Sequence, residues 1–392
     1  MIQLNQYYTD NKYGDFLVGK FSSLSPRLAL DLGFGSGSLL NAARRRWSEL
    51  CLIGVDIDND NVSRAKLNSS IEALNHNGFD PSLPDIIKDK YGDIDLLVGN
   101  PPYFSRELDQ DAKKILRKVG MLDCLPANAK KVPAELVFIA QNLRLLSKSG
   151  ELGLIVPAGL ISGEKWKPIR EFLFTNYNVT NVIQLPTNSF KNTDAQTFIL
   201  IVKQKLSSEE TVSISYINAP QSMQISTKDA SNRADFMYYK STSVISLPSD
   251  ISENDFFLFR GNKSKNELSI LVDNFIHTTD LPAVPSNGFY INTPSIHSNN
   301  MQKGDILIAR VGRRCLGRTL YVNQGSLPIS DCIIGIRPSS LEVAGILWEK
   351  LSHPRCRNFL QEVSLGVGAK YITYRTITDY LTTGCHATSR EF

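Results

Sequence analysis

Short apolar runs alternate with longer stretches of mixed apolar and polar residues through the first half of the chain. Runs rich in Val, Ile and Leu that end at Gly, Asp or Asn predict buried strands. The mixed stretches predict helices that cover a sheet. The predicted strands are 28–32, 51–55, 94–99, 152–156, 179–185 and 197–202. The predicted helices are 13–22, 38–46, 60–75, 134–146 and 166–175.

This alternation indicates an α/β fold built on a parallel sheet. The last two predicted strands are separated by the polar segment 186–194 instead of a helix. A polar connection between neighbouring apolar runs is typical of a hairpin. We therefore expect a parallel sheet that ends in an antiparallel hairpin.

A glycine-rich loop follows the first predicted strand. The sequence GFGSG at 33–37 lies between strand 28–32 and helix 38–46. This order opens many nucleotide-binding sheets, because glycines let the backbone approach a ligand closely. Asp56 ends the second strand, where a carboxylate suits a ribose diol. Asp58 is the alternative, although its position favours the start of the next helix.

The tetrad Asn100-Pro101-Pro102-Tyr103 follows strand 94–99. The carboxyl ends of strands are where open α/β sheets place their chemistry. The prolines fix φ and remove two N–H donors, and Asn100 adds a side-chain carbonyl acceptor. Converging acceptors beside an aromatic face suit a planar ring with an exocyclic amino group. The alternative, a proline-rich turn without function, is disfavoured by the glycine loop upstream.

An acid between the second strand and the tetrad could accept a hydrogen bond from an adenine amino group. Asp80 is our choice for this contact, and Asp85 is the alternative.

Composition limits the class of protein. At 392 residues the chain is long enough for two domains, which we place at 1–245 and 246–392. A net charge of +4 is compatible with a polyanionic partner. The six cysteines and five histidines show no spacing typical of metal ligands, so we expect no metal and no disulfide framework. No stretch has the character of a signal peptide or a membrane span, and we expect a cytoplasmic protein without membrane contact.

Over about residues 3–204 the chain resembles the gamma-type N6-adenine DNA methyltransferases of restriction–modification systems, which use S-adenosylmethionine. The resemblance implies a Rossmann-like sheet and assigns cofactor contacts. Tyr8 and Thr9 resemble a Phe/Tyr-Thr-Pro motif that contacts the methionine moiety, with Asp10 in place of the proline. The other matching positions are Asp31, Gly33, Gly35 and Gly37 in the cofactor loop and Asp56 at the ribose.

The tetrad matches the catalytic NPPY motif of that family. The resemblance implies that Asn100 Oδ1 and the Pro101 carbonyl accept both N6 hydrogens of a flipped-out adenine, and that Pro102 completes the motif. The methyl group then moves by direct in-line displacement, which needs positioning and electrostatics. Tyr103 is expected to stack on the flipped base. Phe190 is similar to a second aromatic residue that holds this base, and the alternative for it is a place in the core.

Residues 256–382 resemble, more loosely, the target-recognition domains of type I specificity subunits, which implies a smaller α+β DNA-recognition domain. The resembling strands are 303–312 and 366–372. Segment 303–318 carries five basic residues against one acid, a balance that suits phosphates and guanine edges. The candidate DNA-binding residues are Arg310, Arg313, Arg314, Arg318 and Lys370. A basic surface without a partner is the alternative.

Together these resemblances imply a sequence-specific DNA adenine-N6 methyltransferase whose partner is double-stranded DNA. Such a chain would be the modification component of a restriction–modification system, and a separately encoded restriction endonuclease is a further partner that the resemblance leaves open. The alternatives are a glutamine N5-methyltransferase of the release-factor type, an RNA-base N-methyltransferase and a specificity protein that only binds.

Overall fold

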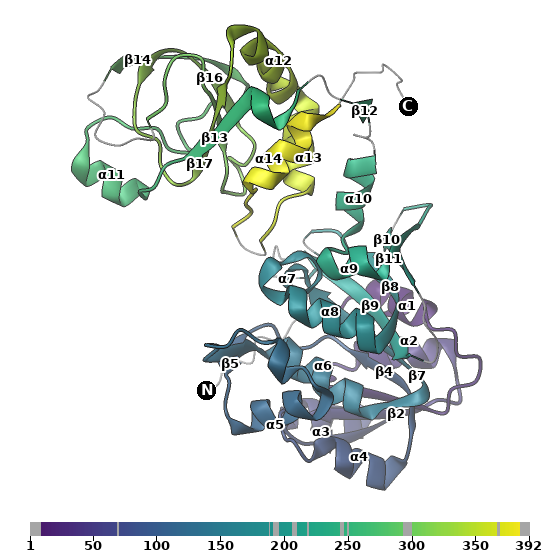
Figure 1. Ribbon diagram of the computed structural model, residues 1–392. Helices are drawn as coiled ribbons and strands as arrows, with labels where there is room; N and C mark the ends of the chain where they lie inside the picture. Colours follow the sequence, from purple (N-terminus) through teal and green to yellow (C-terminus); the bar gives the residue numbers. More distant parts are fainter. Residues whose placement is uncertain are drawn as a thin grey trace. The chain divides into compact units, whose positions relative to one another are not determined.

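The chain folds as two compact units, Met1–Phe236 and Met237–Phe392 (Figure 1). The computed structural model describes residues 9–68, 70–187, 189–190, 196–205, 210–217, 219–243, 247–248, 251–292, 300–366 and 369–384. The division falls at the start of α10 (Phe236–Ser243). A domain boundary after residue 245 stays a prediction. Across these described ranges, no helix combines the length and the apolar character needed to cross a membrane.

The first unit is built on a nine-stranded sheet with the order β11-β10-β8-β9-β7-β4-β1-β2-β3. Its strands are β1 (Leu28–Leu32), β2 (Cys51–Asp56), β3 (Ile71–Asn75), β4 (Ile94–Gly99), β7 (Leu146–Pro157), β8 (Tyr177–Gln184), β9 (Thr197–Gln204), β10 (Thr211–Tyr216) and β11 (Met223–Ser226). The strands from β3 to β7 pair in parallel, and β9 lies antiparallel between β7 and β8. This confirms the predicted α/β fold class.

The sheet continues beyond the β8–β9 hairpin, which differs from the expectation that the hairpin ends it. Strand β10 pairs in parallel with β8, and β11 pairs antiparallel with β10. Their sequence is rich in Ser and Thr, but Val212 and Ile214 alternate with polar residues and are buried. Alternation with period two is enough to form a strand against an existing edge.

Helices cover both faces of this sheet. They are α1 (Asn11–Gly19), α2 (Ser38–Arg46), α3 (Asn59–Asn68), α4 (Leu83–Tyr91), α5 (Gln110–Val119), η1 (Leu122–Cys124), α6 (Ala134–Leu145), α7 (Ala158–Ser162), η2 (Glu164–Trp166), α8 (Lys167–Asn176) and α9 (Thr227–Asn232). A small two-stranded antiparallel sheet, β5 (Ser105–Glu107) with β6 (Lys131–Pro133), follows the tetrad. Helices α1, α2 and α3 share one buried apolar core with alternate residues of the strands.

The predicted helix 60–75 is wrong in its second half. Helix α3 ends at Asn68, and Ile71–Asn75 forms the edge strand β3, parallel to β2. Leu67, near the end of α3, is 81% exposed. Ile71 and Ala73 are buried while Glu72 between them is exposed, which is the period of a strand and not of a helix.

The second unit is an α+β fold around a five-stranded sheet with the order β13-β17-β15-β16-β14. Strands β14 and β16 pair in parallel, and the other described neighbours in this sheet pair antiparallel. Its elements are β12 (Leu247–Pro248), η3 (Glu253–Asp255), β13 (Phe256–Arg260), α11 (Lys265–Leu271), β14 (Ser286–Asn292), β15 (Ile306–Ala309), β16 (Thr319–Ser326), β17 (Ile333–Pro338), α12 (Leu341–Ser352), α13 (Pro354–Glu362), α14 (Tyr374–Thr382) and β18 (Thr383–Gly384). The predicted strand 303–312 corresponds to β15. The described part of 366–372 forms no such strand and contributes only isolated bridges, at Tyr371.

Candidate active site

A pocket of about 370 Å³ opens where β1, β2 and β4 end. It brings together most of the residues that the sequence singled out in the first unit. These are Thr9, Asp31, Gly33, Gly35, Asp56, Asn100, Pro101 and Pro102. Gly37, Asp80, Tyr103 and Phe190 do not line it, and Tyr8 lies outside the described residues.

The glycine loop is shaped by backbone geometry that only glycine adopts easily. Gly33, Gly35 and Gly37 all have positive φ, of 80°, 54° and 78°. Gly35 N–H donates to Asp56 Oδ2 at 2.8 Å, so the loop is fastened to the end of β2. At Gly37 a Cβ would lie 2.7 Å from Ile71 Cδ1. Gly37 therefore allows the loop to pack on β3, and its contact with a cofactor stays a prediction.

The sequence left Asp56 and Asp58 as alternatives for the carboxylate at the ligand site, and the structure places them differently. Asp56 is buried and lines the pocket, and its Oδ1 accepts from Asp58 N–H at 2.9 Å. Asp58 accepts from Asp60 N–H and so lies at the start of α3. The carboxylate at the pocket is that of Asp56.

Asp31 is a buried acid whose Oδ1 has no hydrogen-bond partner. Burial, and secondly the charge of Asp56, raise the pKa of Asp31 well above its usual range. A buried carboxylate without a counter-charge is costly. Because Asp31 lines the pocket, a cationic group bound there would supply that counter-charge.

The tetrad is held rigidly at the end of β4. Asn100 Nδ2 donates to Thr9 Oγ1 at 3.2 Å, which ties the tetrad to the segment before α1. The Tyr103 hydroxyl donates to Asn100 Oδ1 at 2.7 Å or to the Ile155 carbonyl at 3.0 Å. The amide plane of Asn100 is therefore fixed from both sides. The Tyr103 hydroxyl is directed inward, and stacking of its ring on a base stays a prediction.

Asp10 stands where the resembled family has proline, and the backbone keeps the proline geometry. Its φ is −62°, the value that a proline ring imposes. The Asp10 side chain also accepts from Lys12 N–H and caps α1. The turn that presents Thr9 to Asn100 is thus compatible with aspartate.

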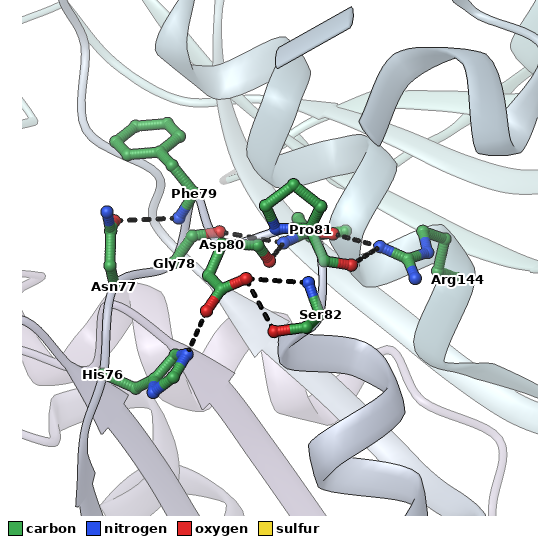
Figure 2. Close-up of polar contacts among 9 residues, drawn as sticks. His76, Asn77, Gly78, Phe79, Asp80, Pro81, Ser82 and Arg144 are labelled. Atoms are coloured by element: carbon green, nitrogen blue, oxygen red, sulfur yellow. Dashed lines mark hydrogen bonds and ion pairs between the residues drawn. The ribbon is translucent and has the colours of Figure 1, made fainter. Parts of the chain in front are cut away.

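The loop between β3 and α4 supplies another wall of the pocket, and Asp80 lies in this loop without lining the pocket (Figure 2). The Asp80 carboxylate accepts from Ser82 N–H at 2.8 Å and lies 2.8 Å from His76 Nε2. The Ser82 hydroxyl bond is the main cause that lowers the pKa of Asp80. These bonds hold the carboxylate within the loop, and its contact with an adenine amino group stays a prediction. Asp85, the alternative, pairs with Arg144 outside the pocket.

Asn77 is the side chain that the sequence reasoning missed. It lines the pocket together with Gly78 and Phe79, and its Oδ1 accepts from Phe79 N–H at 3.0 Å. Its signal in the sequence is its position just after β3, a segment whose apolar pattern predicts a helix instead.

Helix α6 fixes this loop from behind, as Figure 2 shows for Arg144. Gln141 Nε2 donates to the carbonyls of Gly78 and Asp80, at 3.1 and 2.7 Å. Arg144 Nη1 donates to the Pro81 carbonyl at 2.7 Å and to Gln141 Oε1 at 2.9 Å. A Cβ at Gly78 would lie 2.7 Å from Phe138 Cζ, so glycine permits the close approach.

Replacing Gln141 by Leu is expected to weaken binding of the pocket's ligand about tenfold, because two buried carbonyls lose their donor and the loop shifts. The maximal rate of a reaction at Asn100 should change less than about threefold, because the substitution leaves Asn100 in place. Titration of the ligand and steady-state kinetics measure the two effects. The matched control is Gln204→Leu, which removes an amide bond to the Leu146 carbonyl away from the pocket. Equal ligand affinity in both variants would contradict the role of Gln141.

Aromatic residues close the same end of the pocket. Phe79 makes edge-to-face contacts with Phe104 and Phe138, at centroid distances of 6.1 and 5.0 Å. The guanidinium of Arg106 lies 4.1 Å from the centroid of the Phe79 ring. This apolar wall suits a planar ring.

Phe190 is part of the core, which corrects its expected role at the flipped base. It is 3% exposed, and its ring lies 6.0 Å from that of Tyr13 on α1. The side chain belongs to the apolar core beneath α1, α2 and α3, which holds it away from the pocket. Its polar neighbours in the sequence favour a place on a pocket wall, but burial under α1 decides its position.

The five candidate DNA-binding residues of the second unit differ in their surroundings. Arg313 and Arg314 are exposed, whereas Arg318 is half-buried and donates to the Leu281 carbonyl. Arg310 and Lys370 come from neighbouring segments, because Gly312 N–H donates to the Lys370 carbonyl. Their contact with DNA stays a prediction.

Comparison with known proteins identifies the first unit. The sequence model described as N-6 DNA Methylase matches residues 3–243. The type II methyltransferase M.CvrRI of Paramecium bursaria Chlorella virus XZ-6E is 20% identical over 199 residues, 51% of this chain and 48% of that protein. The tRNA1(Val) (adenine(37)-N6)-methyltransferase of Aeromonas salmonicida (strain A449) is 30% identical over 150 residues, 37% of this chain and 58% of that protein.

A solved structure extends the similarity of fold to both units. The type IIG restriction endonuclease BpuSI superposes with a TM-score of 0.55 at 14% identity, over 95% of this chain and 58% of that one. The chain thus spans about half the length of the relatives that it matches. Because the family model covers more than half of the chain and includes the tetrad and the glycine loop, this chain belongs to the N-6 DNA Methylase family.

Proposed function

We propose that this chain transfers a methyl group from S-adenosylmethionine to the N6 atom of adenine in duplex DNA. The observation that carries the proposal is the Asn100 amide. Thr9 and Tyr103 fix it at the rim of a pocket that also contains Asp31 and Asp56. An amide acceptor beside a nucleotide-sized pocket suits a planar amino group.

The residues of the pocket fit the proposed cofactor. S-adenosylmethionine supplies a methyl group that its positively charged sulfonium activates. The unpartnered Oδ1 of Asp31 suits a cationic part of such a molecule, and Asp56 suits a ribose hydroxyl. Both Asp56 oxygens already accept from the protein, but a carboxylate oxygen accepts more than one bond. The wall of Phe79, Phe104 and Phe138 suits the adenine.

Asn100 would act as a positioned acceptor. The Tyr103 hydroxyl uses one lone pair of Asn100 Oδ1, and a carbonyl oxygen has two. The remaining lone pair and the Pro101 carbonyl would accept the hydrogens of the target amino group, so that its nitrogen lone pair faces the methyl donor. Catalysis then comes from alignment and fixed dipoles.

The second unit is the part that would bind the DNA. In the proposal, Arg310, Arg313, Arg314, Arg318 and Lys370 contact phosphates or base edges. The proposal places the chain in the cytoplasm as the modification component of a restriction–modification system, beside a separately encoded endonuclease. The family's description as a DNA methylase and the +4 net charge support a DNA substrate.

RNA is the second candidate substrate, because a relative at 30% identity is a tRNA adenine-N6 methyltransferase. Glutamine methylation in a protein is the third. The purified full chain should be incubated with methyl-labelled S-adenosylmethionine and, separately, with duplex DNA, tRNA and a release factor. We expect label only in DNA, and only as N6-methyladenine after digestion to nucleosides. Label in tRNA or protein alone would overturn the proposal, and N4-methylcytosine would overturn the choice of base.

A further inference from the structure

A second hollow, of about 680 Å³, lies entirely within the second unit. It forms where the edge strand β13 passes the start of α14. The side chains that give it chemical character are Phe257, Arg260, Arg310, Tyr374 and Arg375. Of these five, Arg310 alone is among the candidate DNA-binding residues that the sequence suggested.

The hollow is strongly basic. Three arginines line it, and the residues that form its wall include no carboxylate. Arg375 is 90% exposed and lies 3.7 Å from Asp379, so solvent screens that pair and much of its charge stays available. Arg310 Nε donates to the backbone carbonyl of Asp331 and not to its carboxylate. The hollow therefore offers a positively charged surface to a ligand.

Backbone hydrogen bonds hold two of the three contributing segments to each other. Ile372 N–H donates to the Arg310 carbonyl at 3.0 Å, and Gly312 N–H donates to the Lys370 carbonyl at 2.9 Å. Thr373 Oγ1 accepts from Thr376 N–H and caps the helix that starts at Tyr374. The arginines are thus presented by ordered backbone, which lowers the entropy cost of binding.

Two aromatic rings lie beside the arginines. Phe257 is 64% exposed, and its ring is stacked on that of Phe259 with 6.5 Å between centroids. Tyr374 is 41% exposed. Burial raises the pKa of Tyr374, and the positive charges of Arg260 and Arg310 act against that rise. Both rings therefore present apolar faces next to the arginines, on which a ligand can pack.

We propose that this hollow binds the sugar–phosphate backbone of duplex DNA. Arg260, Arg310 and Arg375 face phosphates, and the rings of Phe257 and Tyr374 pack on the sugars. A line of phosphates carries the repeated negative charge that three arginines match, and contacts of this kind position a protein without reading sequence. The inference rests on the proposed DNA substrate. The hollow would contribute affinity for DNA of any sequence, while Arg313 and Arg314 remain candidates for reading bases.

Fluorescence anisotropy of the full chain tests the hollow. The variants Arg260→Gln, Arg310→Gln and Arg375→Gln are titrated with a labelled duplex that contains the preferred site and with a random duplex, at salt concentrations from about 50 to 300 mM. Each variant should bind both duplexes about five- to tenfold more weakly near 0.1 M salt, and the salt slope should fall by about one unit. Arg355→Gln, an exposed arginine on α13 outside the hollow, is the matched control and should bind like the parent.

Two variants guard against misfolding as the cause of weaker binding. Arg375→Gln changes a side chain that is almost fully exposed. Arg260→Lys keeps the positive charge and should keep the salt slope. If all three glutamine variants bind both duplexes like the parent, an acidic protein or nothing occupies the hollow and the inference is wrong. Loss of binding to the preferred duplex alone would also overturn it. Methylation of DNA by the parent chain is assayed separately. If the parent methylates DNA but the hollow variants bind normally, only the inference about the hollow is wrong. If the parent does not methylate DNA, the proposed function itself is wrong.

Discussion

Replacing Asn100 by Ala is expected to lower the rate of methyl transfer by about two to three orders of magnitude, the effect of removing one preorganised polar group at a reacting centre. The variant lacks the amide oxygen that accepts from the target amino group. Cofactor affinity should change little, because the glycine loop, Asp31 and Asp56 keep their positions. Single-turnover methyl transfer and a cofactor titration measure the two quantities.

The control for this variant is Asn176→Ala, which removes an amide bond to the Phe172 carbonyl at the end of α8. It should transfer methyl groups at the parental rate. A near-parental rate for Asn100→Ala would remove the tetrad from the mechanism. A large loss of cofactor affinity would show instead that Asn100 shapes the cofactor site.

Replacing Asp31 by Asn is expected to weaken cofactor binding by about two orders of magnitude, as truncation of one partner of a buried charge pair does. In the parent, affinity should fall as pH falls through the raised pKa of Asp31, because protonation removes the negative charge. The variant should lack this pH dependence. Calorimetric titration across a pH series, with Asp95→Asn at the other end of the sheet as control, measures both effects.

The same substitution should stabilise the chain when no cofactor is bound. With a raised pKa the folded state binds more protons than the unfolded state, so parental stability falls as pH rises through that pKa. The amide in the Asp31→Asn variant would remain neutral, and we expect a gain of about 1 kcal/mol in the free energy of unfolding at neutral pH. Chemical denaturation of both proteins without cofactor measures this difference. A variant that is less stable and binds cofactor normally would contradict this account of Asp31.

Strong local patterns made much of the first unit predictable. The apolar runs before Gly33, Asp56 and Asn100 form buried strands. Their apolar side chains favour burial, and their short length between turn residues favours a strand. Their shared parallel direction gathers the residues that follow them at one edge of the sheet. Asp31, near the end of β1, therefore meets Asp56 and Asn100 in one pocket.

The residues that were misassigned depend on contacts that no local pattern shows. Ile71 and Ala73 form a strand because the edge of β2 is available to them. Asn77, which follows this strand, lines the pocket. Phe190 is buried because α1 covers it, although its neighbours in sequence are polar. The hollow of the second unit joins side chains from three distant segments, so local patterns did not predict it.

Single-molecule sequencing of DNA from cells that express this chain tests the central claim most directly. Parallel cultures express the parent and the Asn100→Ala variant at equal protein levels. The account predicts N6-methyladenine at one recurrent sequence motif with the parent and none above background with the variant. Absence of N6-methyladenine from the DNA of cells that contain the folded parent, or the same methylation with both proteins, would contradict it.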